Sequence, residues 1–440
     1  MRPYFGLPGF STSVANYPIH EYSKVMLKDN IVSALFLDSG GGWSGGPLSS
    51  EVSIVCGDPD LTISCQDGKT RIGSLCGPEI MTKNPLDVLD IYLSEGYTAA
   101  GYIGYEYSKY TDTGFRPVRR KDGYRCPDLV FNLYEPDKVH MMDIGELRGR
   151  LSFATKNTDI STGAGKGYSS NLNSQSYYEK IRRIKEYIKA GDVYQVNISR
   201  RISFYRDYDP LDFFLKLFHV QHVPFGCYFD FDSFQIVSGS MELFARKEAG
   251  QLTTRPIKGT AAGGAGLENN TVNKAKLLAS DKERAENLMI VDLMRNDLGR
   301  ICKRGSVRVN KLFEVESYST LHHMVSEVEG IIREDVSLAD IMDNIFPPGS
   351  VTGAPKKRAL EIIDELEPHY RGPYCGIAGI VRPDGDFTFN VAIRTLVKSM
   401  GRTDFWVGGG IVWDSEPEDE FEETRLKAMA IEKAFGLMND

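Results

Sequence analysis

The chain has 440 residues, of which 41% are hydrophobic and 25% are charged, and its formal net charge is -8. This length predicts about two or three domains of ordinary size, and the composition is typical of a soluble globular protein. The acidic balance excludes a general attraction to nucleic acid or to anionic membranes, and no apolar stretch approaches the roughly 20 residues that cross a bilayer.

The seven cysteines are scattered, and none forms a Cys-x-x-Cys pair. An odd count without such pairs predicts neither a disulfide framework nor a structural zinc site. The first residues show no long apolar segment followed by a small-residue cleavage site. We therefore expect a reduced protein in the cytoplasm, with no nucleic-acid or membrane partner.

Short β-type runs broken by glycine fill the first third of the chain, and a stretch rich in Ser, Thr, Gly and Asn follows near residues 155–173. Such a stretch is typical of a surface connection. We expect an N-terminal region at residues 1–155 and a second region at residues 173–437, which together form one intertwined globule.

The second region begins with a helix, because apolar residues recur at helical spacing over Tyr177–Ile188. A strand over Val193–Phe204 follows, with Gln195 on the face opposite its alternating apolar side chains. A hairpin near Gly250 then joins two more strands. A capping box at Ser280 predicts the start of a long helix.

The last third of the chain predicts a helix at residues 354–366, a β-meander at residues 374–412 and a final helix from Glu418. The chain shows no internal repeat. Many antiparallel strands with helices between them, and no βαβ rhythm, indicate an α+β fold.

Two pairs of glutamates stand three residues apart in predicted helices: Glu283 with Glu286, and Glu420 with Glu423. Residues at this spacing share a helix face. Brought together, the two pairs would offer the oxygen ligands that Mg2+ prefers and leave positions for water or an anionic substrate. A solvated acidic helix face explains the same pattern, and composition alone favours it.

Lys258 follows one strand of the predicted hairpin, and Glu242 closes the segment before the other strand. If the strands pair, both side chains lie at the same end of the sheet. Desolvation lowers the pKa of an ammonium group and only the free amine attacks carbon, while a carboxylic acid helps a hydroxide to leave. A loop lysine and a strand-end surface carboxylate are the simpler alternatives.

The glycines at 408–410 expose backbone N–H groups that can bind an anion, although a bulge or turn is the commoner reason for such a run. His323, Tyr374 and Arg394 are isolated candidates, for which core packing, cross-strand packing and a surface charge are the alternatives. Residues 349–356 do not have the spacing of a phosphate-binding loop, so we reject nucleotide binding there.

Four segments occur in order along the chain: Thr-Arg-Pro-Ile-Lys-Gly-Thr at 254–260, Val-Asp-Leu-Met-Arg-Asn-Asp-Leu at 291–298, Gly-Ser-Val-Thr-Gly-Ala-Pro-Lys at 349–356, and Gly-Gly-Gly-Ile-Val at 408–412. With these segments the chain resembles the chorismate-utilising enzymes, which include anthranilate synthase component I, aminodeoxychorismate synthase component I, isochorismate synthase and salicylate synthase. The resemblance is strong over residues 177–435 and weaker before them. It implies a chorismate-binding catalytic region and a sandwich-like core of two large, mostly antiparallel β-sheets with helices outside.

The resemblance also implies roles for single residues. Glu286 and Glu423 would bind Mg2+, with Glu283 and Glu420 in support. The groups that would bind the carboxylates or line the ring pocket of chorismate are the backbone N–H groups of Gly408, Gly409 and Gly410 and the side chains of Tyr374, Arg394, Lys427, His323 and Ser350.

At two positions the chain resembles one branch of the family, the aminodeoxychorismate synthases. Lys258 stands where aminodeoxychorismate synthases carry their nucleophile and anthranilate synthases usually carry alanine, and Gln195 replaces the lysine general base of the water-using enzymes. The resemblance therefore implies Mg2+-dependent amination of chorismate to 4-amino-4-deoxychorismate, for para-aminobenzoate and folate synthesis. Lys258 would add to the ring while Glu242 helps the hydroxyl leave. One departure is the segment Ala261–Gly266, where many relatives have an Arg-Gly segment.

None of the seven cysteines lies in the Gly-x-Cys-x-Gly turn of a class I glutaminase. A separate glutaminase subunit is therefore implied as the source of ammonia. Anthranilate synthase component I, which eliminates pyruvate, is the nearest alternative. A second alternative is a non-catalytic subunit that binds chorismate or tryptophan, as some relatives bind tryptophan in their N-terminal half.

Overall fold

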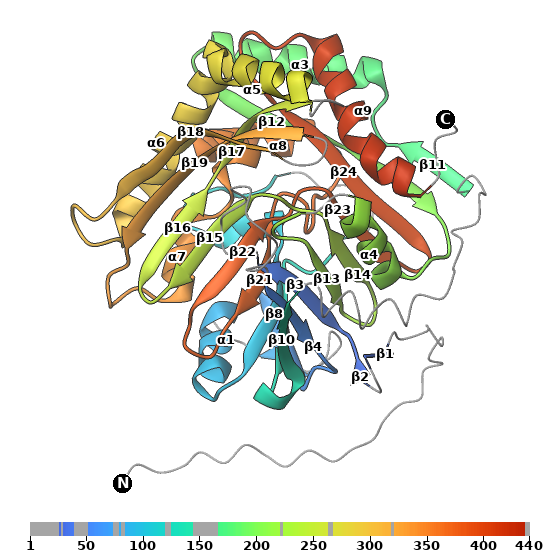
Figure 1. Ribbon diagram of the computed structural model, residues 1–440, viewed down its shortest axis with the longest axis vertical. Helices are drawn as coiled ribbons and strands as arrows, with labels where there is room; N and C mark the ends of the chain where they lie inside the picture. Colours follow the sequence, from blue (N-terminus) through green and yellow to red (C-terminus); the bar gives the residue numbers. More distant parts are fainter. Residues whose placement is uncertain are drawn as a thin grey trace.

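The structure is a computed structural model that describes residues 26–27, 30–38, 52–73, 79–80, 84–118, 125–143, 166–220, 223–262, 267–317 and 321–435. Within these residues two large antiparallel β-sheets form the centre of the molecule, and helices lie outside them (Figure 1). The predicted α+β fold with a two-sheet core is therefore confirmed.

The first sheet has ten strands within the described residues. In spatial order they are β10 (Val139–Asp143), β4 (Val52–Cys56), β3 (Ala34–Asp38), β13 (Cys227–Asp230), β14 (Gln235–Ser238), β23 (Thr395–Ser399), β24 (Arg402–Ile411), β12 (Gln195–Tyr205) and β11 (Lys166–Ser170), and β20 (Gly353–Ala354) also pairs with β12.

The second sheet has twelve strands in the same part of the chain. Their order is β17 (Ile257–Ala262), β19 (Leu321–Ile331), β16 (Gln251–Arg255), β15 (Leu243–Glu248), β22 (Phe387–Val391), β21 (Ile377–Val381), β8 (Thr98–Ile103), β9 (Leu129–Tyr134), β5 (Leu61–Gln66), β6 (Lys69–Ile72) and β7 (Glu79–Ile80), with β18 (Arg308–Ser317) paired to β19. A separate small pair is formed by β1 (Met26–Leu27) and β2 (Asn30–Ile31).

The described helices surround these sheets (Figure 1). They are α1 (Pro85–Ser94), α3 (Ser174–Lys189), α4 (Pro210–Val220), α5 (Leu267–Ala279), α6 (Asp281–Ile301), α7 (Leu338–Ile345), α8 (Lys356–Leu366) and α9 (Pro417–Ala434), with 3-10 turns η1 (Tyr105–Tyr110), η2 (Pro136–Lys138) and η3 (Gly349–Val351). No helix in the described residues is long and apolar enough to cross a membrane.

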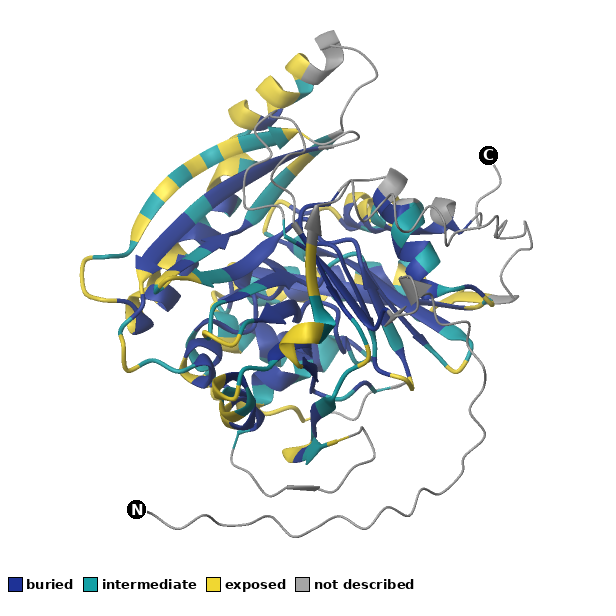
Figure 2. Cartoon of the chain, turned by 60° about the horizontal axis from the view of Figure 1, so that its bottom comes forward, coloured by how far each residue is buried: buried dark blue, intermediate teal, exposed yellow. Residues whose placement is uncertain are grey.

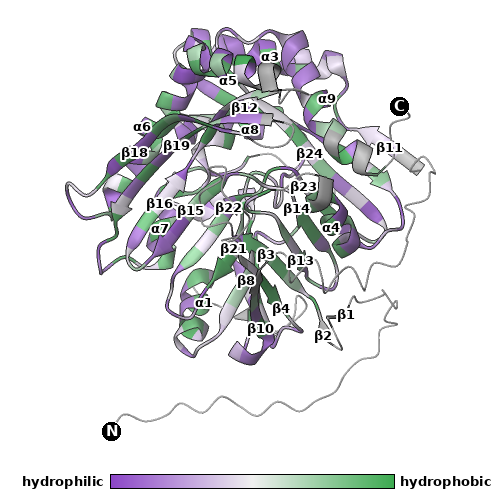
Figure 3. Ribbon diagram, viewed as in Figure 1, coloured by the Kyte–Doolittle hydropathy of each residue, from purple (hydrophilic) through white to green (hydrophobic). Residues whose placement is uncertain are grey.

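Strands from both parts of the chain share both sheets. In the first sheet β3 pairs with β13, and in the second sheet β8 pairs with β21. Strands β8 and β21 are buried along their whole length. Figure 2 shows that the strands in the interior of the molecule are mostly buried, and Figure 3 shows hydrophobic residues along the strands at the centre. The two sequence regions therefore contribute to a common interior.

The predicted hairpin near Gly250 joins β15 and β16, with Leu243 opposite Arg255. Ala249 and Gly250 make the turn with φ angles of 48° and 80°, a region that glycine adopts without strain. The long helix also begins where predicted, since the Ser280 side chain caps the first turn of α6. The hairpin turn and the helix cap therefore fix where β15, β16 and α6 begin or turn, and these elements carry or adjoin the candidate site.

Two predicted boundaries were wrong by two residues. The strand expected from Val193 begins at Gln195. The helix expected from residue 354 begins at Lys356, because Ala354 pairs with Gln195 as part of β20. A long-range strand pairing thus replaces the first turn that the helical pattern suggested.

Candidate active site

Glu242 and Lys258 lie at the same end of the hairpin sheet, as the sequence predicts. Glu242 directly precedes β15, and Lys258 is the second residue of β17. The backbone N–H of Ile257 donates to Oε1 of Glu242 at 3.4 Å, and the Ser350 hydroxyl donates to the same oxygen at 2.6 Å. The structure therefore brings Ser350, from η3, to the predicted acid.

Glu242 is 3% exposed. Burial raises the pKa of this carboxyl to about 7, although the hydrogen bonds from Ser350 and Ile257 and the charge of Lys258 oppose the rise. A carboxyl with this pKa retains its proton near neutral pH and can act as a general acid.

Desolvation lowers the pKa of Lys258, and the positive charge of Lys427 adds to the effect, while the carboxylates of Glu286, Glu242 and Glu423 oppose it. A lowered pKa increases the fraction of free amine, which is the form that attacks carbon. The surroundings thus favour a protonated acid and a neutral amine in one place.

Gln195 and Gly410 complete the wall beside Lys258. A Cβ atom added to Gly410 would lie 2.7 Å from Nε2 of Gln195 and 3.1 Å from Nζ of Lys258. Only glycine at this position leaves both groups in place. The site therefore lies where β12 and β24 of the first sheet approach β17 of the second.

The four predicted metal ligands come from α6 and α9. Glu283 Oε2 lies 3.0 Å from the point where Gly259 would carry a Cβ, and Glu420 Oε2 lies 2.8 Å from the corresponding point of Gly409. Burial raises the pKa of Glu283, of Glu286 and of Glu420, and repulsion from neighbouring glutamates adds to each rise. The glutamate pairs of α6 and α9 are therefore close enough to interact electrostatically across the site.

Glu423 differs from the other three glutamates, because its ion pair with Lys427 lowers its pKa. The Lys427 amine lies 2.6 Å from Oε1 of Glu423 and donates to the backbone oxygen of Gly408 at 3.0 Å. Lys427 is therefore the cationic partner of Glu423, whereas Lys282 and Lys258 supply the positive charges that act on Glu283 and Glu286.

The donor set fits a hard divalent cation. It consists of carboxylate oxygens that repel one another, which is the chemistry that Mg2+ relieves. Over the described residues, no group of three or more His, Cys, Asp or Glu side chains converges closely enough to hold a metal ion. The metal role of these glutamates therefore stays a prediction.

The glycine run in β24 pairs with β12, with Gly408 opposite Ser199 and Gly410 opposite Asn197. The N–H groups of Asn197 and Ser199 donate away from β24. Because successive residues of an antiparallel ladder alternate in direction, the N–H groups of Gly408 and Gly410 also point away from β12, and that of Gly409 points toward it. Since β23 pairs with β24 only before the glycines, Gly408 and Gly410 are the better anion donors.

His323, Arg394 and Tyr374 have different surroundings. His323 is buried opposite Thr260, and burial together with the charge of Arg394 lowers its pKa to about 3, so its ring is neutral. Arg394 thus lies near the predicted ring pocket. Tyr374 stacks on Trp406 with ring centres 6.1 Å apart, and its contact with a substrate carboxylate stays a prediction.

Three polar residues near the site were not predicted as site residues. Ser415 donates to Oε1 of Glu420 at 2.6 Å. Asn197 and Thr352 are buried, and Nδ2 of Asn197 has no hydrogen-bond partner within the described residues. The alternation of β12 could have identified Asn197, since it shares a face with Gln195, but Thr352 lies in an irregular segment without such a signal.

The family model described as "chorismate binding enzyme" matches residues 34–433. Aminodeoxychorismate synthase component 1 of Escherichia coli (strain K12) is 41% identical over 408 residues, which cover 87% of this chain and 90% of that protein. Anthranilate synthase component 1 of Thermus thermophilus is 36% identical over 356 residues, which cover 76% of each chain. The crystal structure of anthranilate synthase component I from Streptococcus pneumoniae TIGR4 matches with a TM-score of 0.74 and 28% identity, over 87% of this chain and 92% of that chain. The chain therefore belongs to the chorismate-binding enzyme family and is a chorismate-utilising enzyme.

Proposed function

We propose that this enzyme aminates chorismate with ammonia to give 4-amino-4-deoxychorismate, a precursor of para-aminobenzoate and folate. The observation that carries the proposal is the placement of an amine, Lys258, and a buried carboxyl, Glu242, at one end of the sheet that contains β15 and β17. The similarity to relatives named aminodeoxychorismate synthase component 1 supports the same reaction.

In the proposed reaction, Nζ of Lys258 forms a bond to the chorismate ring as the ring C–O bond breaks. Glu242 gives its proton to the departing hydroxyl, which leaves as water. Ammonia then adds at the carbon that lost the hydroxyl, and the bond to Lys258 breaks to restore the free amine. The added nitrogen returns one proton to Glu242, so the sum is exchange of hydroxyl for amine with release of water.

The residues that would hold Mg2+ are Glu286 and Glu423, with Glu283 and Glu420 beside them. When bound, the ion would supply positive charge for a substrate carboxylate. Lys427, Arg394 and the N–H groups of Gly408 and Gly410 would bind the carboxylates from the protein side, while His323 and Ser350 line the ring pocket and Gln195 the amine side. We further propose that a separate glutaminase subunit supplies the ammonia, and the component 1 names of the relatives support a partner.

Mass analysis of the product from chorismate, Mg2+ and an ammonium salt tests the proposal. We expect a product in which one hydroxyl is replaced by an amine, and a covalent adduct on Lys258 when ammonia is withheld. Lys258→Ala should abolish amination, while Lys311→Ala, which removes an exposed lysine of β18, should leave it unchanged. Near-wild-type amination by Lys258→Ala without any adduct in the native enzyme would exclude the nucleophile role.

Formation of anthranilate is the second candidate, because several relatives are named anthranilate synthase component 1. The two reactions differ in one product. Anthranilate formation releases one pyruvate for each chorismate consumed, whereas formation of 4-amino-4-deoxychorismate releases none. A pyruvate assay on the same reaction therefore separates the two candidates.

A further inference from the structure

Helix α8 ends in a buried ion pair. Glu367 is the C-cap residue of α8 and is 2% exposed, and Arg371, four residues later, is 1% exposed. Nε and Nη2 of Arg371 donate to the two carboxylate oxygens of Glu367 at 2.9 Å and 2.7 Å. Two parallel hydrogen bonds of this kind fix the direction of a guanidinium group as well as its place.

The guanidinium group also donates to two backbone carbonyl oxygens. Nη1 of Arg371 donates to Val351 at 3.1 Å, and Nη2 donates to Asn197 at 2.7 Å. Val351 directly follows Ser350 in η3, and Asn197 lies two residues after Gln195 in β12. Arg371 therefore connects the turn that carries Ser350 with the strand that carries Gln195.

Glu367 holds the same strand from its own side. The backbone N–H and the hydroxyl of Ser199 donate to Oε1 of Glu367 at 2.7 Å and 2.8 Å. Ser199 lies opposite Gly408 in the ladder between β12 and β24. The ion pair thus also fixes the part of β12 that pairs with the glycine run.

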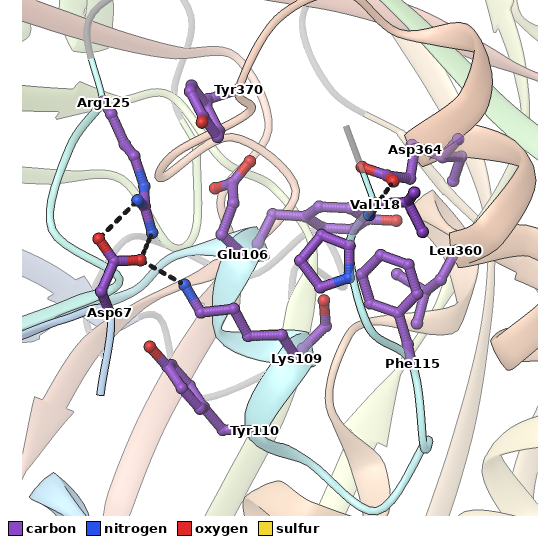
Figure 4. Close-up of a pocket in the computed structure, with 14 residues that line it drawn as sticks. Asp67, Glu106, Lys109, Tyr110, Phe115, Val118, Arg125, Leu360, Asp364 and Tyr370 are labelled. Carbon is purple, nitrogen blue, oxygen red and sulfur yellow. Dashed lines mark hydrogen bonds and ion pairs between the residues drawn. The ribbon is translucent and has the colours of Figure 1, made fainter. Parts of the chain in front are cut away.

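The backbone of Arg371 is held from the side of η1. Its N–H and that of Gly372 donate to Oε1 and Oε2 of Glu106 at 2.8 Å and 2.9 Å. Glu106 lines a surface cavity of about 400 Å³, and Figure 4 shows its carboxylate directed toward Tyr370, the residue before Arg371. The guanidinium carbon lies 4.4 Å from the centre of the Tyr105 ring. Contacts with η1 therefore fix the place from which the side chain of Arg371 reaches inward.

The hydroxyl of Ser350 is the link from this ion pair to the acid. It donates to Glu242 at 2.6 Å, and this hydrogen bond lowers the pKa of a carboxyl that burial raises to about 7. The N–H of Ile257 and the charge of Lys258, both in β17, also act on Glu242. Glu242 in turn acts on the Cys375 thiol, whose pKa burial raises to about 12, so that the thiol is neutral. Of these groups only Ser350 belongs to η3, so a displacement of η3 would remove its hydrogen bond first.

We propose that Arg371, held by Glu367, is a positioning residue for the reaction, because it keeps η3 where the Ser350 hydroxyl can donate to Glu242. This inference rests on the proposed function, in which Glu242 gives a proton to the departing hydroxyl. A lysine in place of Arg371 would carry one nitrogen instead of a planar fork, and could not bond to Glu367 and to both carbonyl oxygens in the same way. The carbonyl of Val351 would then be released, and Ser350 would move away from the acid.

The test compares pH profiles of kcat/KM for chorismate, measured as chorismate consumption by the full chain with Mg2+ and ammonium chloride. Arg371→Lys should move the alkaline limb up by about one pH unit, the effect of one lost hydrogen bond on the ionised carboxyl. Ser350→Ala should cause the same shift, and Arg371→Lys should add no further shift in the Ser350→Ala background. A defect that only reduces the amount of folded enzyme would lower kcat/KM at every pH and leave the limb in place.

Two further variants keep the test independent of folding. Arg201→Lys changes another buried arginine, which lies in β12 and pairs with Asp404, and it should keep the wild-type limb. Glu106→Gln leaves one acceptor oxygen for two backbone N–H groups and should move the limb in the same direction by a smaller amount. This variant carries the test if Arg371→Lys does not fold.

An alkaline limb that stays in place in folded Arg371→Lys, or in Glu106→Gln if Arg371→Lys does not fold, would overturn the positioning role. Additive shifts in the double variant of Arg371 and Ser350 would overturn it as well. Mass analysis of the wild-type product tests the proposed function separately. Absence of aminated product would remove that function, whereas the expected shift in chorismate consumption would still show that Arg371 acts through Ser350 on Glu242.

Discussion

At the scale of single residues, Glu242 combines burial with a hydrogen-bonded carboxyl whose pKa is raised to about 7. We expect kcat/KM for chorismate to fall above about pH 7, as Glu242 loses the proton that the leaving hydroxyl needs, and to fall at low pH, as the amine of Lys258 gains a proton. A pH profile of kcat/KM measures both limbs. Glu242→Gln should lower kcat by roughly 100-fold or more and remove the alkaline limb, and an unchanged alkaline limb in this variant would assign it to another group.

The same carboxyl makes stability depend on pH. Its pKa rises from 4.5 to about 7 on folding, so the folded chain binds the proton more tightly and loses stability as pH rises through this window. Glu242→Gln lacks the ionisation but keeps an oxygen for Ser350. The free energy of unfolding of this variant can be compared with that of the wild type at pH 4.5 and at pH 8. We expect the difference, variant minus wild type, to be larger at pH 8 by on the order of 3 kcal/mol. Urea titrations at the two pH values measure the gain, and a pH-independent difference would contradict the raised pKa.

At the scale of elements, α9 presents neighbouring glutamates with different roles. Glu423 pairs with Lys427 and is close enough to Glu283, Glu286 and Glu420 to affect their pKa values. Glu422 pairs instead with Arg425, and its side chain is similarly exposed, at 58% against 51% for Glu423. Glu423→Gln should lose Mg2+-dependent activity without loss of folded structure, because a direct carboxylate ligand is removed. Glu422→Gln is the matched control and should keep Mg2+-dependent activity. Activity measured against Mg2+ concentration distinguishes the two, and full activity of Glu423→Gln at saturating Mg2+ would exclude the ligand role.

In strand β24, a substitution of Gly410 tests whether its close approach to Gln195 and Lys258 matters for activity. Gly410→Ala would place a methyl group 2.7 Å from Nε2 of Gln195 and 3.1 Å from Nζ of Lys258, so one or both must move. We expect kcat to fall by about tenfold or more, because even a small displacement of a reacting group from its productive position slows the reaction. Gly299→Ala in α6 has nothing within 4 Å of its new methyl group and should keep wild-type kcat. Equal activity of the two variants would show that the close approach at Gly410 is unimportant.

The sequence predicts those elements whose signals are local. The hairpin turn at Gly250 and the cap at Ser280 identify neighbouring strands and a helix start, and the hairpin alone is enough to bring Glu242 toward Lys258. The approach of Gln195 to Gly410 depends on the register of β12 with β24, which links residues far apart in the chain. No local pattern encodes that register, so the approach of Gln195 to Gly410 could not be predicted.

At the scale of the whole molecule, the two sequence regions share their sheets. β3 and β8 from the first region pair with β13 and β21 from the second. We expect residues 166–440 expressed alone to lack a cooperative unfolding transition, because both sheets would lose strands and expose apolar surface. The intact chain should unfold with coincident changes in circular dichroism and tryptophan fluorescence. A fragment that unfolds cooperatively would show that the second region is an independent unit.

The pairing of β8 with β21 also has a consequence for synthesis of the protein. When Thr98–Ile103 leaves the ribosome, its partner Ile377–Val381 has not yet been translated. At about 5–20 residues per second the delay is on the order of tens of seconds. During this time one edge of β8 is open to pairing with other nascent chains. We therefore expect the growing polypeptide to depend on chaperones that bind exposed strands, and slower translation of the residues between the two strands to increase that dependence.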